Sequence, residues 1–236
     1  MWSALLPILP VLPNPAHMDY LLWQLADSGF PAGGFAHSGG LEAAIHHGAV
    51  SDSVSLRLFV LDTIAQSGHG ALPLVTGAHG APEDLHDLDA LCDAFLANTV
   101  ANRASRAQGR AFLSTCRRSF PQDALEKLER DVRETNLAGH YPPLFGAVLN
   151  ALGIDRLDTQ RLFLYLGSRA VMSAAVRLGV VGAYEAQRLQ TATAPDLERA
   201  IERCGHLRPL DITHTAPLID LRQSTHDRLY SRLFQS

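Results

Sequence analysis

DSVSLRLFVLDTIAQ, residues 52–66, carries its apolar side chains at Leu56, Phe59, Val60 and Ile64. Positions three and four apart fall on one face of an α-helix, so this stretch predicts a helix that turns one face toward a core. Elsewhere no run alternates polar and apolar residues, and β-branched residues do not cluster. We therefore predict an all-α fold, a single bundle-like domain of roughly ten helices with an extended C-terminal tail.

The other predicted helices follow from the same periodicity. Ser38 is the expected N-cap of one helix and Asp158 of the longest, because both side chains accept hydrogen bonds from free backbone amides. Pro73 leaves residues 70–80 ambiguous, and Pro195 is expected to divide the last predicted stretch into two helices. The predicted ranges are 19–28, 38–47, 82–95, 102–118, 122–136, 142–152, 159–178 and 184–203.

Three parts of the chain differ in composition. Residues 1–17 are a proline-rich apolar extension that we expect to be disordered, since its prolines prevent a regular helix. Residues 18–205 are the predicted all-helical core, and residues 206–236 are a C-terminal segment that we expect to bind a partner. An alternative for this segment, packing on its own domain, stays open. No membrane span is predicted, because Arg169 and Arg177 interrupt the most apolar stretch.

Composition excludes several classes of protein. The formal net charge of the 236 residues is −4, which argues against a nucleic-acid binder. The absence of Gly-Lys-Ser/Thr excludes a P-loop, and the single lysine, Lys127, lies in a charged run typical of a solvated helix face. The three cysteines, Cys92, Cys116 and Cys204, are odd in number and far apart. Free thiols suit a reducing compartment, so we expect a cytoplasmic protein.

The sequence holds no recognisable catalytic motif. HExxH, GxSxG and EF-hand patterns are absent, and the aspartates of residues 84–93 interleave with leucines as on the exposed face of a helix. We therefore expect no enzyme, no catalytic residue, no bound metal and no cofactor. A metal-binding hydrolase or a direct nickel carrier remains the alternative, because Glu42 and His46 stand four apart on one helical face. The residues of that alternative are His37, Glu42, His46 and His47.

Four segments together resemble the urease accessory protein F family. They occur in the family's order and read LLWQLADSGFPAGGFAHSGGLE (21–42), RASRAQGR (103–110), GHYPPLFG (139–146) and YSRLFQS (230–236). The chain departs from the family in the extension before Met18 and at Ala36, where many members carry a hydroxyl or a larger residue. The resemblance marks these positions as structural or interface residues: Pro31, Gly33, Phe35, Ser38, Gly40, Leu41, Glu42, Arg103, Ser105, Gly109, His140, Gly146 and Arg169.

The resemblance also implies a function. Members of the family help to load nickel into apo-urease, together with an accessory GTPase (protein G) and an accessory protein called D or H. Protein F is thought to bridge these two partners, often as a homodimer, and to govern the GTPase. Its tail is thought to become ordered on binding protein D/H. We expect the tail contacts to come from Tyr230, Ser231, Arg232, Leu233 and Phe234.

Overall fold

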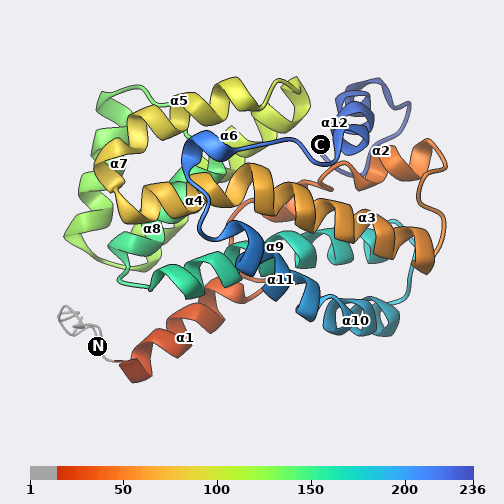
Figure 1. Cartoon of the computed structure of the whole chain (residues 1–236), viewed down its shortest axis with the longest axis horizontal. Helices are drawn as coiled ribbons and strands as arrows, with labels where there is room; N and C mark the ends of the chain where they lie inside the picture. Colours follow the sequence, from red (N-terminus) through yellow and green to blue (C-terminus); the bar gives the residue numbers. More distant parts are fainter. Residues whose placement is uncertain (1–14) are drawn as a thin grey trace, which may run out of the picture.

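The computed structural model describes the backbone from Pro15 to Ser236 and the side chains from Met18 onward (Figure 1). Residues 1–14, and with them most of the extension predicted to be disordered, lie outside this description. The described residues form no strand, so the predicted all-α fold is confirmed. Their helices are α1 (Pro15–Ala26), α2 (Leu41–His46), α3 (Ser53–Gln66), α4 (Leu72–Gly80), α5 (Leu85–Phe95), α6 (Thr99–Ser119), α7 (Asp123–Glu134), α8 (Tyr141–Ala151), α9 (Arg156–Arg177), α10 (Ala183–Ala192), α11 (Ala194–Cys204) and α12 (Pro217–Ser224).

Helix α8 lies at the centre of one contiguous hydrophobic core. Its residues 142–149 are all buried, and α4, α5, α6, α7 and α9 pack around it. Two glycines allow the closest backbone approaches: Gly146 lies against Val75 of α4, and Gly109 of α6 lies against Gly139. A Cβ atom at either glycine would overlap a main-chain carbonyl oxygen. These two signature glycines therefore have a structural role.

The longest helix, α9, covers most of the apolar stretch around residues 162–178. It buries Leu162, Phe163 and Leu164 in the core, while Arg169 and Arg177 stay half-buried and reach main-chain oxygens of the N-terminal region. None of the helices in the described part is both long and apolar enough to cross a bilayer.

Residues 70–80, which the sequence leaves ambiguous, belong to a helical stretch that runs unbroken from α3 into α4. A five-residue π-turn, Ser67–Ala71, joins the two helices. Pro73 lies in the first turn of α4, where its missing amide hydrogen is not needed. Within the π-turn, the carbonyl oxygen of His69 accepts a hydrogen bond from the Thr213 amide of the C-terminal segment at 3.2 Å.

Both predicted N-caps are wrong. Helix α2 begins directly after Gly40, whose φ of +86° favours glycine, so Gly40 and not Ser38 is at the N-cap position. The Ser38 hydroxyl still accepts the Glu42 amide hydrogen at 3.4 Å, and it donates to the C-terminal segment. Helix α9 begins one turn earlier than predicted, with Asp155 as its cap in place of Asp158. The Asp155 carboxylate accepts the Asp158 amide hydrogen at 2.9 Å. Two aspartates three residues apart are equally good caps by composition, so the sequence could not choose between them.

The C-terminal segment, residues 206–236, contains a helix that the sequence prediction missed. Helix α12 buries Ile219 and Gln223, while Leu218 and Leu221 stay exposed. Because a glutamine is buried and two leucines are exposed within these eight residues, the sequence of α12 shows no regular apolar periodicity. The segment passes from α11 over the front of the molecule to α12, so it packs on its own domain (Figure 1).

Candidate interaction site at the C-terminal tail

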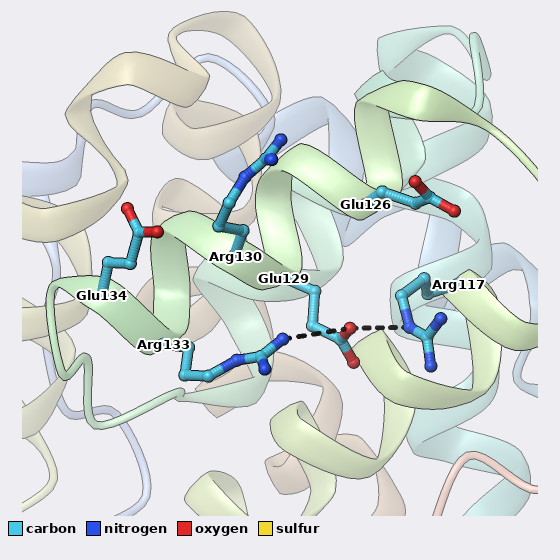
Figure 2. Close-up of a pocket in the computed structure, with 6 residues that line it drawn as sticks. All are labelled: Arg117, Glu126, Glu129, Arg130, Arg133 and Glu134. Carbon is cyan, nitrogen blue, oxygen red and sulfur yellow. Dashed lines mark ion pairs between the residues drawn. The ribbon is translucent and has the colours of Figure 1, made fainter.

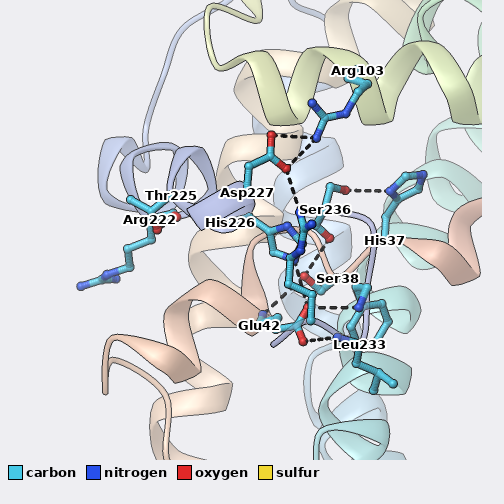
Figure 3. A network of polar contacts seen from close by, with 12 residues as sticks. His37, Ser38, Glu42, Arg103, Arg222, Thr225, His226, Asp227, Leu233 and Ser236 are labelled. Carbon is cyan, nitrogen blue, oxygen red and sulfur yellow. Dashed lines mark hydrogen bonds and ion pairs between the residues drawn. The ribbon is translucent and has the colours of Figure 1, made fainter. Parts of the chain in front are cut away.

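The carboxylate of Glu42 binds the tail peptide, which we define as residues 230–236, to α2. It accepts the amide hydrogens of Leu233 at 2.6 Å and Phe234 at 3.1 Å (Figure 3). The same carboxylate pairs with Nε2 of the fully buried His226 at 3.0 Å. Glu42 is only 9% exposed, and a buried carboxylate requires such partners to compensate for its lost hydration. Its position in the first turn of α2 also suits a negative charge.

The end of the tail peptide is held by the loop that precedes α2. Ser38 donates to the main-chain oxygen of Ser236 twice, from its amide at 2.6 Å and from its hydroxyl at 2.9 Å. The amide of Gln235 donates to the Ala36 oxygen at 2.8 Å. Nδ1 of His37 lies 2.7 Å from the Ser236 hydroxyl oxygen. These contacts join residues that are almost 200 positions apart in the sequence.

Asp227 connects the tail peptide with α6. Arg103 donates to its carboxylate at 2.9 Å and Arg232 at 3.2 Å (Figure 3). The hydrogen bond from Arg103 holds the pKa of Asp227 below its ordinary value. All three side chains are half-exposed, and exposed ion pairs contribute little to stability. This group therefore orients the tail more than it stabilises the fold.

Phe234 anchors the tail peptide through its ring. The Arg177 guanidinium lies between two aromatic rings, with its carbon 4.2 Å from the Phe234 centroid and 3.8 Å from the Phe35 centroid. Phe234 is buried, whereas Phe35 is 68% exposed and its carbonyl accepts a hydrogen bond from Arg177. A guanidinium between two rings is a favourable cation–π arrangement.

The five predicted tail contacts thus divide into two groups. Tyr230 and Ser231 are exposed and Leu233 is half-exposed, and these three can reach another protein. Phe234 instead packs into its own domain and is not available to a partner in this arrangement. Arg232 is occupied with Asp227. The structure thus favours the alternative in which the C-terminal segment packs on its own domain. Contact of these five residues with a partner stays a prediction.

A second group of signature residues forms a buried polar cluster between α5, α6 and α8. The Tyr141 amide donates to the Ser105 hydroxyl at 3.1 Å, and that oxygen lies 3.2 Å from Nδ1 of His140. Nε2 of His140 lies 3.0 Å from the carboxylate of Asp93. The carboxylate requires a hydrogen on Nε2, so Nδ1 of a neutral ring accepts from Ser105. Asp93 is the solvent-exposed member, and the array ties α5 and α6 to the start of α8.

Asp89 was predicted to lie on an exposed helix face, and this prediction is wrong. Asp89 is 2% exposed, and its carboxylate accepts the amide hydrogens of Gly139 and His140 at 3.1 and 2.7 Å. Its spacing from Leu85 and Cys92 places it on the buried face of α5. A carboxylate on an apolar helical face was the signal that could have revealed this contact.

The remaining signature residues shape the loop before α2 and its contacts. Gly33 has a φ of +78°, which a side chain would disfavour, and Leu41 is fully buried. The Pro31 carbonyl accepts a hydrogen bond from Thr115 at 2.9 Å. Arg169 donates to the Ala26 carbonyl. These residues hold the loop in the shape that receives the tail peptide.

The residues of the metal-site alternative do not converge. Glu42 faces His226 and the tail, whereas His46 is exposed at the end of α2. Nε2 of His47 instead lies 2.8 Å from the Thr225 hydroxyl. Across residues 18–236 no three His, Cys, Asp or Glu side chains are grouped as a metal site would need.

A surface hollow of about 480 Å³ lies between α6 and α7, away from the tail (Figure 2). Glu129 pairs there with Arg117 at 2.7 Å and with Arg133 at 3.7 Å. Three arginines and three glutamates balance each other, so the hollow has no net charge to select a ligand. They are Arg117, Glu126, Glu129, Arg130, Arg133 and Glu134.

Known proteins resemble this chain along most of its length. The UreF family model matches residues 50–194. The chain is 37% identical over 225 residues to urease accessory protein F of Oryza sativa subsp. indica, covering 92% of this chain and 85% of that protein. Identity to urease accessory protein F of Arabidopsis thaliana is 37% over 223 residues, 93% of each chain. Urease accessory protein UreF of Arthrobacter sp. (strain FB24) is 30% identical over 215 residues, 91% of this chain and 96% of its own. This chain therefore belongs to the urease accessory protein F family.

Proposed function

We propose that this chain is a cytoplasmic scaffold of urease maturation. It bridges the accessory GTPase (protein G) and accessory protein D/H, and it regulates the GTPase-coupled insertion of nickel into apo-urease. Family membership and the names of its relatives support the connection with urease. Its three cysteines are free and buried, which suits a reducing compartment.

The proposal rests on one observation: some residues of the C-terminal segment pack on the core, while others stay exposed to solvent. Buried contacts through Glu42 and Phe234 fix the segment on the core. The same segment presents Tyr230 and Leu233 of the tail peptide and Leu218 and Leu221 of α12 to solvent. Aromatic and aliphatic side chains displayed on a fixed support are typical of a protein-binding surface. We assign this surface to protein D/H.

We also propose that two copies of the chain associate, and that α1 forms the contact surface between them. This helix contacts the body mainly through α9 and projects away from it at its N-terminal end (Figure 1). Tyr20 and Trp23 are 67% and 64% exposed, and their rings pack edge to face at 5.1 Å. Large exposed aromatic residues are enriched in interface cores, so α1 is the contact for a second copy of the chain.

A pair of matched tyrosines tests the D/H surface. Tyr230 and Tyr184 are both largely or fully exposed, on the tail peptide and on α10. Replacing Tyr230 with alanine should reduce co-purification of protein D/H at least tenfold, the loss of about 1.4 kcal/mol expected for an interface aromatic residue. Tyr184→Ala should leave it unchanged. Equal capture of protein D/H by both variants would contradict a role for the tail peptide in this interface.

A further inference from the structure

His37 occupies a position where a positive charge is unfavourable while the tail is docked. It follows the short turn Gly34–Ala36, and Nδ1 of its half-buried ring lies 2.7 Å from the Ser236 hydroxyl oxygen (Figure 3). Docking of the tail peptide therefore covers this ring. Burial disfavours the charged form of an imidazole, since it removes the water that solvates the charge.

The charged groups around this site come from every element that meets the tail. Both carboxylates are already bonded: that of Glu42 by His226 and two amides, and that of Asp227 by two arginines. The main-chain oxygen of Ser236 already accepts two hydrogen bonds. A proton on His37 would therefore add a positive charge to a site with several cationic side chains and two engaged carboxylates. The titratable and charged groups are Glu42 of α2, Arg103 of α6, Arg177 of α9, and His226, Asp227 and Arg232 of the C-terminal segment.

The pKa of His37 responds in the direction that this geometry requires. Burial lowers it below the ordinary value of 6.5, and the positive charges of Arg103 and His226 lower it further. If the tail peptide leaves, the His37 ring regains water. Its pKa then returns toward the ordinary value.

We propose that His37 makes docking of the tail peptide acid-sensitive: the tail is docked while the imidazole is neutral and leaves its site when the imidazole takes up a proton. The docked state binds the proton less readily than the undocked state. Docking is therefore independent of this group above pH 6.5 and weakens as the pH falls below 6.5, by up to tenfold per pH unit. The weakening stops once the pH has passed the lowered docked pKa.

This inference deepens the proposed function, because an acid-released tail would also release protein D/H; that consequence rests on the proposed function. The response of the tail itself does not. A free tail peptide no longer holds Tyr230 and Leu233 in a fixed place, so the binding surface loses its shape. Assembly would then be favoured at neutral pH and disfavoured in acid.

Amide hydrogen exchange in the full-length chain measures the docking directly. The amides of Leu233, Phe234 and Gln235 are bonded to Glu42 or Ala36 only when the tail is docked. Their protection would be followed between pH 5 and 8 in the wild type, in His37→Gln, and in the control His86→Gln, whose ring is exposed on α5.

The expected result is a ratio of wild-type to His37→Gln protection that stays constant above pH 6.5 and falls by up to tenfold per unit below it. His86→Gln should follow the wild type. Parallel curves for the wild type and His37→Gln would overturn the proposal.

A titration of the wild type covers the case in which His37→Gln fails to dock at any pH. The NMR signal of the His37 ring, assigned by its absence from the variant, should titrate with a midpoint below 6.5. A midpoint at or above 6.5 would overturn the proposal. Capture of protein D/H at pH 7.5 and 5.5 separates the two claims: no capture at either pH, with the exchange response intact, contradicts the proposed function alone.

Discussion

The carboxylate of Glu42, in the first turn of α2, accepts the amide hydrogen of Leu233 at 2.6 Å across 191 residues of sequence. This bond joins two segments that the family resemblance singles out separately, the N-terminal signature and the end of the chain. It shows that the tail peptide binds to the helical core of its own chain. Changing this buried carboxylate removes one of the main contacts that hold the tail peptide and should weaken its docking.

Glu42→Gln should therefore undock the tail peptide. Glutamine has nearly the same size, but it replaces one acceptor oxygen with a donor that faces a main-chain amide. We expect the free energy of unfolding to fall by about 1–3 kcal/mol, as for hydrogen bonds to a buried charge. Urea unfolding would measure this fall, and amide exchange at Leu233 and Phe234 would show its location. The control Glu202→Gln, on the exposed face of α11, should change stability by less than about 0.5 kcal/mol.

Alanine at either close-approach glycine should destabilise the core. Gly109→Ala and Gly146→Ala each place a methyl group on a main-chain oxygen, that of Gly139 before α8 or that of Val75 in α4, so the packed backbone has to shift. The expected loss is about 1–3 kcal/mol or more, measured as a lower midpoint of thermal unfolding. Gly167→Ala is the matched control in α9, where nothing lies within 4 Å of the new Cβ. It should raise stability by up to about 1 kcal/mol, and a similar loss at all three positions would contradict the packing described.

The buried cluster around His140 predicts a pH dependence of stability. Hydrogen bonds from Asn102 and His140 lower the pKa of Asp93 below its ordinary value of 3.8. The Asp93 carboxylate therefore contributes its full stabilisation of the fold above pH 3.8. That contribution is lost as the pH falls through the lowered value. The difference in unfolding free energy between the wild type and Asp93→Asn should be full at pH 6 and shrink below pH 3.8. Asp87→Asn, at an exposed position of α5, should show no such change, and a constant difference for Asp93→Asn would refute the assignment.

Trp23→Arg should disrupt self-association through α1. A charge placed among exposed aromatic residues cannot be buried in a symmetric interface without a partner. Sedimentation equilibrium should show a dimer for the wild type and a monomer for the variant, with an unchanged helical circular dichroism spectrum. Leu58→Arg is the control, because Leu58 is similarly exposed on α3. If both variants keep the wild-type mass, α1 is not the interface.

Much of the fold could be predicted because most helices bury a regular apolar face. The range 52–66 predicts α3 almost to its ends, since its apolar spacing is regular. Helix α12 could not be predicted in the same way, because its burial comes from packing on α2 and α6 and not from its own composition. The Ser38 cap could not be predicted in full for a related reason, because its hydroxyl makes a tertiary contact with Ser236 in addition to a local one with the Glu42 amide.

The candidate site could be predicted in its parts but not in its assembly. Glu42, Ser38 and Arg103 were singled out by the family resemblance, as was the tail peptide. Nothing in a linear pattern says that a glutamate of α2 caps amides at the other end of the chain. Asp227 and His226 were missed altogether, because neither belongs to a local motif and both gain their role from contacts made only in the fold.

Stepwise assembly of the three proteins tests whether this chain bridges protein D/H and the GTPase. The immobilised chain would be exposed first to protein D/H and then to the GTPase, with and without the substitution Glu42→Gln. We expect the wild type to capture protein D/H and then the GTPase in one ternary complex, and the variant to capture protein D/H at least tenfold less well. A folded wild type that captures neither protein, or a variant that assembles the complex as well as the wild type, would contradict it.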